Sequence, residues 1–375
     1  MAPRIAIIGA GLGGITAALA LRKAGLDVSI HEQAPVLRAL GAAITMTPNA
    51  MKVIGGLVEG DAIRRLGYRP PWRLNRTWDT GAITSEVELG PAAEAKFGAP
   101  LLMFHRAELL AALAAAIPPE SIHLGRKLVS VENLADGVRV RFSDDSEVTA
   151  EAVIGADGIH STVRELLFGP QAPHFTGAVG YRSLVPIERL SDMDISPFTK
   201  WWGPTRESEV VTCPTSGGRE FYVFASIAQD AWREEAWSTP GDVREVREAF
   251  SNFAPELQRV LAACDETLKS ALCERNPLPV WTQGRITLLG DACHPMTPFM
   301  AQGAAMAIED SAILSRCLAG VSAADLPRAL QNYENSRRER TSKMQVSSHN
   351  NQWHANPVDA NWVYGFDAWT AKLAA

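Results

Sequence analysis

The sequence predicts an α/β protein with a parallel sheet in one lobe and a smaller, strand-rich second lobe. Three observations support this fold class: an apolar strand, glycine turn and helix at the start of the chain; two later apolar runs that each end in glycine and aspartate; and an aromatic- and proline-rich stretch between those two runs. At 375 residues, the chain exceeds what one ordinary hydrophobic core holds. We therefore expect two lobes or one elaborated domain.

The composition favours small-molecule chemistry. With 46% hydrophobic and 21% charged residues and a net charge of −6, the chain can bury a core and is not typical of disorder. Its 36 Lys+Arg against 42 Asp+Glu argue against the broad basic face that nucleic acids or anionic membranes require. The five cysteines show no CxxC spacing, which indicates reduced thiols in the cytoplasm and neither disulfides nor a metal site.

The first element is a βαβ unit. An apolar strand at Ile5–Ile8 leads into the turn Gly9–Gly14, a helix over Ile15–Ala24 and a second strand over Asp27–Glu32. Glycines in a GxGxxG pattern let backbone N–H groups approach a pyrophosphate, and the helix N-terminus adds positive potential. A glycine turn alone could serve packing, but the order of elements and the terminal Glu32 favour dinucleotide binding. The residues leave open whether the dinucleotide is NAD or FAD.

Two further strand ends are expected at the ligand-binding edge of the sheet. Val153–Gly158 contains Asp157, although this segment alone could be a strand-to-helix turn with Ser161 as a cap. Ile286–Asp291 is followed by two prolines and the pair Gln302-Gly303, which predicts a rigid loop before a helix that runs to about Ala319. A second helical stretch is expected over residues 326–347.

The stretch between these strand ends predicts the second lobe. Strand patterns occur at Glu209–Cys213 and Phe221–Ile227, and an alternating pattern over residues 138–148 predicts a meander beside the first sheet. We divide the chain into a dinucleotide-binding domain, a substrate-binding domain and a C-terminal tail that packs or contacts another subunit. Their boundaries are 1–70, 100–175 and 280–345 for the first, 71–99 and 176–279 for the second, and 346–375 for the tail.

These motifs, in this order, resemble the class A FAD-dependent aromatic hydroxylases, which are single-component flavoprotein monooxygenases. The resemblance covers nearly the whole chain, and Lys200–Trp202, Met300–Gly303 and Trp362–Gly365 are similar to the members that act on hydroxynicotinate. It implies a Rossmann-like FAD-binding domain of the glutathione-reductase type, with a smaller β-sheet substrate domain and C-terminal helices. It also implies FAD as the cofactor, NADH or NADPH as a transient reductant, and O₂-dependent hydroxylation of a small aromatic or hydroxypyridine carboxylate through a flavin C4a-hydroperoxide.

The resemblance also implies roles for individual residues. The pyrophosphate would be wrapped by Gly9, Gly11, Gly13 and Gly14. The adenosine ribose would be contacted by Glu32 and Gln33, and adenine by Leu128. Arg106 matches the family's arginine beside FAD, and Asp157 and Asp291 occupy its two aspartate positions. The pyrimidine edge of the isoalloxazine would receive backbone N–H groups from Gln302, Gly303 and Ala304, with Pro298 beside the ring. A helix that begins near Gly303 would direct its positive end at the N1 and O2 side of the reduced flavin.

The substrate pocket departs from the hydroxynicotinate-hydroxylating members. Thr45 and Phe299 stand where those members have histidines, Thr297 replaces a lysine and Phe198 a cysteine; their pocket tyrosine falls near Thr212, with Tyr222 the closest tyrosine here. The candidate catalytic residues are therefore Thr45, Thr212, Tyr222 and Phe299.

The divergent pocket leaves the mechanism and substrate open. The substrate proton could pass to solvent or to Tyr222, or the substrate could already be ionised, and Thr45 could simply pack. A decarboxylative reaction, a salicylate- or hydroxybenzoate-type hydroxylation and a non-oxygenating flavin reductase all remain open. We expect a cytoplasmic monomer or homodimer that takes part in the catabolism of aromatic compounds.

Overall fold

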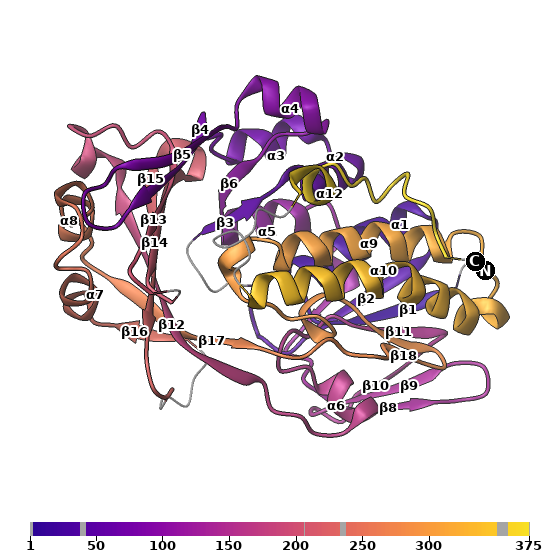
Figure 1. The fold of residues 1–375 in the computed structure, drawn as a ribbon. Coiled ribbons are helices and arrows are strands. Elements are labelled where there is room, and N and C mark those ends of the chain that lie inside the picture. The colour runs from indigo at the N-terminus through magenta and orange to yellow at the C-terminus, as the bar shows by residue number, and fades with distance from the viewer. Residues whose placement is uncertain (1–2, 38–42, 206, 233–237, 351–358, 375) are drawn as a thin grey trace.

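The computed structural model describes residues 3–37, 43–205, 207–232, 238–350 and 359–374. A six-stranded sheet forms the centre of the larger lobe (Figure 1). Its order is β18 (Thr282–Gln283), β19 (Ile286–Leu288), β11 (Ala152–Gly155), β1 (Arg4–Ile8), β2 (Asp27–Glu32) and β7 (Ile122–Leu124). All of its neighbours are parallel except β18 and β19. The predicted parallel sheet is therefore confirmed, and its carboxyl-terminal strand ends meet at one edge.

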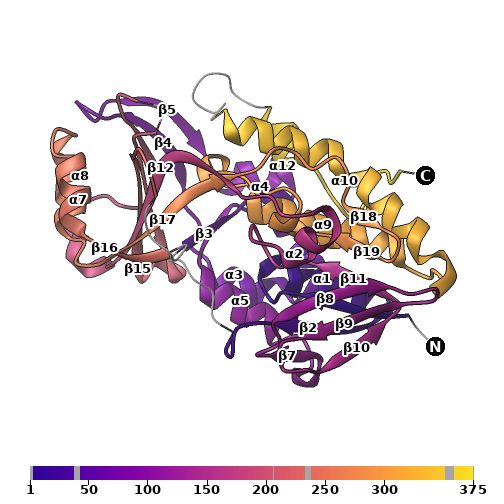
Figure 2. The same ribbon diagram turned by 90° about the horizontal axis from the view of Figure 1, so that it is seen from below.

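Helices cover one face of this sheet and a small sheet covers the other (Figures 1 and 2). The helix α1 connects β1 to β2 and packs against α9, which in turn packs against α10. Their bounds are α1 (Leu12–Lys23), α9 (Gly303–Leu318) and α10 (Leu326–His349). The opposite face carries the meander β8 (Leu128–Asn133), β9 (Val138–Phe142) and β10 (Glu147–Ala150). The two predicted C-terminal helical segments and the meander are confirmed.

The second lobe is built on an eight-stranded sheet, at the left of Figure 1. Its strands, in spatial order, are β16 (Ser238–Gly241), β17 (Thr267–Glu274), β12 (His174–Pro186), β15 (Glu220–Ala228), β14 (Glu209–Thr215), β13 (Phe198–Trp202), β4 (Trp72–Thr77) and β5 (Ile83–Glu88). The pair β13 and β4 is parallel and the others are antiparallel. The helices α7 (Val243–Ala249) and α8 (Pro255–Ala262) pack on its outer face and bury an apolar core there. The inner face of the sheet is directed toward the larger lobe.

Shorter elements join the two lobes. A two-stranded sheet of β3 (Ala43–Met46) and β6 (Leu102–His105) lies between them. The remaining helices are α2 (Pro48–Leu57), α3 (Gly60–Leu66), α4 (Pro91–Phe97), α5 (Arg106–Ala114), α6 (Thr162–Phe168) and α12 (Ala360–Tyr364), with short 3₁₀ turns at Pro119–Ser121, Ile187–Leu190, Ser216–Gly218, Gly290–Ala292, Pro298–Met300 and Ala323–Asp325. Among the described residues, none of the helices has the length and apolarity needed to cross a bilayer.

Candidate active site

A cavity of about 1130 Å³ lies between the two lobes. Its volume exceeds the roughly 300–1,000 Å³ typical of a site for one small molecule. The wall combines the glycine turn and strand ends of the larger lobe, the loop before α9 and the inner face of the eight-stranded sheet. One cavity can therefore hold a dinucleotide and a second, smaller molecule.

The glycine turn is close-packed on one side and open on the other. Gly9 has a φ of +103°, and a Cβ there would lie 2.5 Å from the Ala156 carbonyl oxygen. A Cβ on Gly14 would lie 2.0 Å from the Gly9 carbonyl oxygen, whereas a Cβ on Gly11 would meet no atom within 4 Å. Gly9, Gly11 and Gly13 line the cavity and Gly14 does not. We therefore correct the role expected for Gly14: it allows α1 to pack closely on β1.

Two helix N-termini face the cavity. The helix α1 begins after Gly11 and α9 after Gln302, and neither has a side-chain hydrogen bond to its first-turn N–H groups or an acidic residue in its first turn. Gly11, Gly303 and Ala304 line the cavity at these ends. Uncapped N–H groups and the positive end of the helix dipole suit anionic groups such as a pyrophosphate or the electron-rich edge of a flavin.

The expected adenosine end of the cavity contains Glu32, Gln33 and Leu128. The Glu32 carboxylate accepts hydrogen bonds from the backbone N–H groups of Ala10 at 2.8 Å and Ala34 at 2.9 Å, so it is held at the end of β2.

His31, which the sequence analysis did not single out, also lines this end. Burial lowers its pKa to about 4, and its ring stacks on His123 and Phe142. It is therefore a neutral aromatic wall at physiological pH.

The two aspartates and Arg106 lie on the same cavity wall. Asp157 accepts hydrogen bonds from the Ser161 hydroxyl at 2.6 Å and the Val163 N–H at 3.1 Å, and Ser161 caps α6. Both interpretations of this segment, as a helix start and as part of a ligand-binding wall, are thus compatible with the geometry. Asp291 is exposed to the cavity. The surrounding protein raises the pKa of Asp291, which His294 and Arg106 oppose by favouring the carboxylate.

The loop before α9 is held by buried hydrogen bonds. Ala301 has a φ of +52°, an uncommon conformation for a residue with a Cβ that must be maintained by its surroundings. Gln302 does not line the cavity: its amide donates to the Thr47 hydroxyl at 3.0 Å and accepts from Asn49 at 3.1 Å. The Gln302 side chain therefore ties the loop to α2, while Pro298, Gly303 and Ala304 form the cavity wall. A contact of the Gln302 backbone N–H with the flavin remains a prediction.

The inner face of the eight-stranded sheet supplies the other end of the cavity. Alternation along β13 and β14 directs Phe198, Lys200 and Trp202, and Glu209 and Val211, into the wall. Thr212 points away from the wall because it follows Val211 in the strand, so its expected contact with substrate is corrected.

The other three candidate catalytic residues line the cavity. Phe299 packs in an apolar cluster with Tyr222, Phe224 and Val211. Thr45 donates its hydroxyl to the Met103 sulfur at 3.0 Å. Tyr222 accepts a hydrogen bond from Arg182.

The sequence analysis also missed several polar residues of this wall. Lys200 and Glu209 form a buried ion pair of 2.7 Å between the ammonium nitrogen and Oε2, and Arg73 from β4 lies nearby. Tyr364, from the segment expected to be a tail, also lines the cavity and hydrogen-bonds Arg73. Period-two alternation in the Lys-Trp-Trp segment could have identified Lys200 as sharing a face with Trp202.

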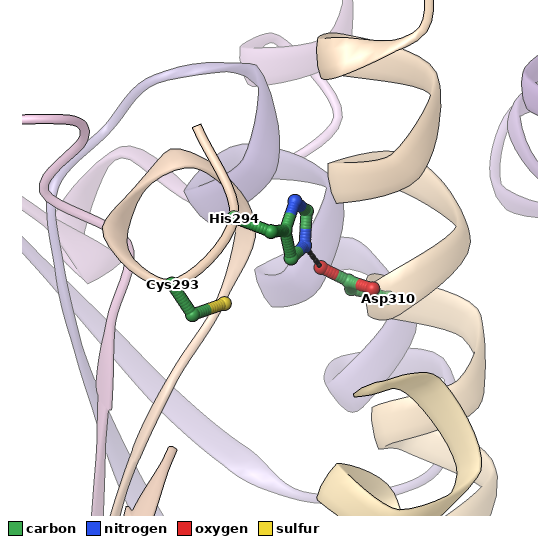
Figure 3. Close-up of side chains that lie close together, drawn as sticks. All are labelled: Cys293, His294 and Asp310. Carbon is green, nitrogen blue, oxygen red and sulfur yellow. Dashed lines mark hydrogen bonds and ion pairs between the residues drawn. The ribbon is translucent and has the colours of Figure 1, made fainter. Parts of the chain in front are cut away.

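Cys293, His294 and Asp310 bring three potential metal ligands within 4.8 Å of one another behind the cavity wall (Figure 3). The Cys293 sulfur, both Asp310 oxygens and His294 Nε2 already have partners, whereas His294 Nδ1 makes no hydrogen bond to any described residue. His294 Nε2 hydrogen-bonds Asp310 Oδ2 at 2.6 Å, Cys293 Sγ donates to the Gly290 carbonyl, and Asp310 Oδ1 pairs with Arg337 at 2.6 Å. Burial raises the pKa of the Cys293 thiol well above its usual value, whereas metal binding needs the thiolate. The geometry is that of a structural network that fixes the loop to α9.

Comparison with known proteins agrees with this geometry. A family model described as an FAD binding domain matches residues 3–348. The chain is 39% identical to 6-hydroxynicotinate 3-monooxygenase of Bordetella bronchiseptica over 99% of this chain and 97% of the relative. Among solved structures, HpxO of Klebsiella pneumoniae in complex with FAD and uric acid is 29% identical with a TM-score of 0.84, covering 96% of this chain and 90% of that one. A salicylate hydroxylase substrate complex is 25% identical with a TM-score of 0.84, covering 98% and 96%.

Proposed function

Because this chain belongs to the FAD-binding family shared with the aromatic hydroxylases, we propose that it uses NADH or NADPH and O₂ to hydroxylate a small aromatic or hydroxypyridine carboxylate. The observation that carries this proposal is a single cavity that joins the glycine turn and two uncapped helix N-termini to an aromatic-lined pocket. We propose a cytoplasmic location, which the five free cysteines support.

The cofactor supplies electron transfer and oxygen activation when it is bound. In this proposal the glycine turn and the start of α1 hold the pyrophosphate, and Glu32 accepts hydrogen bonds from the ribose. The N-terminus of α9 stabilises negative charge on the pyrimidine edge of the isoalloxazine by about 0.3–1 kcal/mol at an exposed site and more when sheltered. The sequence contains no second GxGxxG, which supports transient binding of the nicotinamide cofactor.

The protein's own part in the reaction is to orient a ring and exclude water from it. Phe299, Val211 and Phe224 form an apolar wall against which a flat ring can pack. The relative named 6-hydroxynicotinate 3-monooxygenase supports a pyridine substrate. Loss of CO₂ from the hydroxylated carbon is one form of the proposed reaction, and plain hydroxylation is the other. The divergent residues Thr45 and Phe299 instead favour a different or wider substrate range, because a pocket that lacks matched polar groups discriminates less.

The test is a panel of hydroxylated aromatic and pyridine carboxylic acids added to the purified yellow protein. We expect slow oxidation of NADH or NADPH without substrate and an increase of at least tenfold with the correct acid, together with O₂ consumption and a hydroxylated product. Release of CO₂ from a carboxyl-labelled acid separates the decarboxylative reaction from plain hydroxylation. If no acid changes the rate of NADH or NADPH oxidation and no hydroxylated product forms, the rival function, a flavin reductase, would be favoured.

Tyr222 is expected to act as a hydrogen-bonding group and not as a general base. Burial raises the pKa of its phenol above 10, although Arg182 and Arg106 oppose this, so the hydroxyl stays protonated throughout the neutral range. We therefore expect the Tyr222→Phe variant to lower kcat/KM by about tenfold or less, a loss on the scale of one hydrogen bond, and to keep every inflection of the wild-type pH profile between pH 6 and 9. Disappearance of an inflection in the variant would identify Tyr222 as the titrating group.

A further inference from the structure

Three charged side chains lie together on the inner face of the eight-stranded sheet, and we call Arg73, Lys200 and Glu209 the charge cluster. Lys200 and Glu209 are 7% and 1% exposed, and all three line the cavity. Lys200 also lies 3.9 Å from the centre of the Trp202 ring, which faces the cavity from the same strand. The cluster is therefore built into the wall and is not a set of solvated surface charges.

The positions of Lys200 and Glu209 separate these two residues from the groups assigned to the flavin. Lys200 is opposite Val211, and Val211 is opposite Phe224, so these three form one row across the sheet. Glu209 and Trp202 form the next row, farther from Tyr222, which interacts electrostatically with Arg106. Arg73 is opposite Phe198, on the other side of the Lys200 row. A ring packed on Val211, Phe224 and Phe299 would therefore present one edge to Lys200.

The cluster carries two cations and one carboxylate, a net charge of +1. Burial lowers the pKa of Lys200, and the Glu209 carboxylate opposes this. Glu209 Oε2 lies 2.7 Å from the Lys200 ammonium nitrogen, so these two buried groups form a close ion pair. The second cation, Arg73, is half-buried and lines the same cavity as Lys200, so an anionic group in the cavity can approach both cations. That makes an anionic ligand the natural complement of this wall.

The C-terminal segment fixes the outer side of the cluster. Tyr364 hydrogen-bonds Arg73 and lines the cavity. Lys52 donates to the carbonyl oxygens of Tyr364, Gly365 and Phe366 at 3.1, 3.0 and 3.1 Å, and Arg340 donates to two further carbonyl oxygens just before them. Arg73 is thus preorganised by a segment far from it in the sequence.

We propose that Lys200 and Arg73, with Glu209 setting their net charge, bind an anionic oxygen substituent of the substrate ring, either a carboxylate or an ionised hydroxyl. This inference rests on the proposed function, because it concerns the ring that the same cavity would hold. The cluster is then a specificity determinant: it selects rings whose anionic edge lies opposite the apolar wall. Glu209 is a positioning residue that orients Lys200 and limits how strongly the site attracts anions.

A series of charge variants tests the proposal by direct binding. The dissociation constant of 6-hydroxynicotinate is measured at pH 7 by calorimetry and by perturbation of the flavin absorbance of the holoprotein. Lys200→Gln and Arg73→Gln lower the cluster charge to zero, and each is expected to weaken binding tenfold or more. Glu209→Gln raises the charge to +2 and is expected to tighten binding about tenfold. The double variant K200Q/E209Q restores +1 and is expected to bind within about threefold of wild type.

The sign pattern distinguishes ligand binding from a purely structural pair. If the pair served stability alone, Lys200→Gln and Glu209→Gln would both weaken binding or both leave it unchanged, and either result overturns the proposal. Glu256→Gln is the matched control, because Glu256 pairs with Arg76 away from the cavity wall. Should Lys200→Gln or Glu209→Gln fail to fold, Arg73→Gln and the double variant still decide the outcome. Neither of these variants leaves Lys200 or Glu209 as a buried charge without its ion-pair partner.

Two further ligands identify the anionic group. Nicotinate has only the carboxylate and 6-hydroxynicotinamide only the ring oxygen. Charge dependence that persists with nicotinate assigns the carboxylate to the cluster, and dependence that persists with the amide assigns the ring oxygen. If the dissociation constants of nicotinate, 6-hydroxynicotinamide and 6-hydroxynicotinate are the same in all charge variants, the cluster is not a binding site. Because these measurements need no turnover, a protein that binds these rings but hydroxylates none would overturn the proposed function and leave this inference standing.

Discussion

The Gly14→Ala variant is expected to lose FAD and much of its stability. A Cβ at this position would lie 2.0 Å from the Gly9 carbonyl oxygen and 3.5 Å from the Ala156 Cβ. Since the first obstacle is backbone, α1 must move away from β1, which separates the turn from the strand end that shapes it. We expect a loss of about 3 kcal/mol or more in the free energy of unfolding. Chemical denaturation and the flavin absorbance of the purified protein measure the two effects.

Two other glycines supply controls for this prediction. A Cβ on Gly55, at the exposed end of α2, meets nothing within 4 Å, so Gly55→Ala should leave FAD bound and gain about 0.5–1 kcal/mol. A Cβ on Gly11 also meets no protein atom, but it would enter the space proposed for the pyrophosphate. Gly11→Ala should therefore fold like wild type and bind FAD weakly. A yellow Gly14→Ala protein with wild-type stability would contradict the packing role.

The same glycine turn illustrates what sequence can predict. Gly9 to Glu32 are local, and their order alone specified the strand, turn, helix and strand that the structure contains. The order of residues could not show which glycines line the cavity and which allow close packing. The close approach of Gly14 to Gly9 depends on how near the helix lies to the strand end. The domain boundaries and the roles of individual cofactor-binding residues remain predictions.

The substrate pocket was predicted less well because it depends on register and on distant segments. Similarity to the family suggested Thr212, but β14 begins at Glu209, and alternation then directs Glu209 and Val211 inward and Thr212 outward. Lys52 and Arg340 bind the backbone around Tyr364 and help to hold it at the cavity. No local pattern in the sequence encodes such contacts.

A second large effect is expected at the buried charge network behind the loop that precedes α9. Arg337 is fully buried and pairs with Glu309 at 2.7 Å and with Asp310 at 2.6 Å. Asp310 also accepts a hydrogen bond from the Gly290 N–H, and Glu309 one from the Asn49 amide, so the network reaches both segments that fix the loop. The Arg337→Met variant removes the shared cation. Breaking a buried pair in this way typically costs about 3–5 kcal/mol, because it leaves charge without compensation.

The pH dependence of this loss separates electrostatics from lost packing. Burial favours protonation of Glu309 and Asp310, but Arg337 and other nearby cations outweigh it and hold both pKa values below their ordinary range. In the wild type this contribution is present above the unfolded pKa values, near 4, and is lost as pH falls through the lower folded values. Without Arg337 the folded pKa values rise, so acidification from pH 7 to pH 5 should recover part of the lost stability of the variant.

The matched control for this prediction is Arg328→Met, which breaks the exposed contact with Asp325 at 3.4 Å. It should cost no more than about 0.5 kcal/mol at either pH. Unfolding curves in urea at pH 7 and pH 5 measure all three proteins. If Arg337→Met lost equal stability at both pH values, methionine packing would explain its effect and the network would contribute little charge stabilisation. Recovery at pH 5 confined to Arg337→Met would instead show that paired charge holds the start of α9 against the cavity.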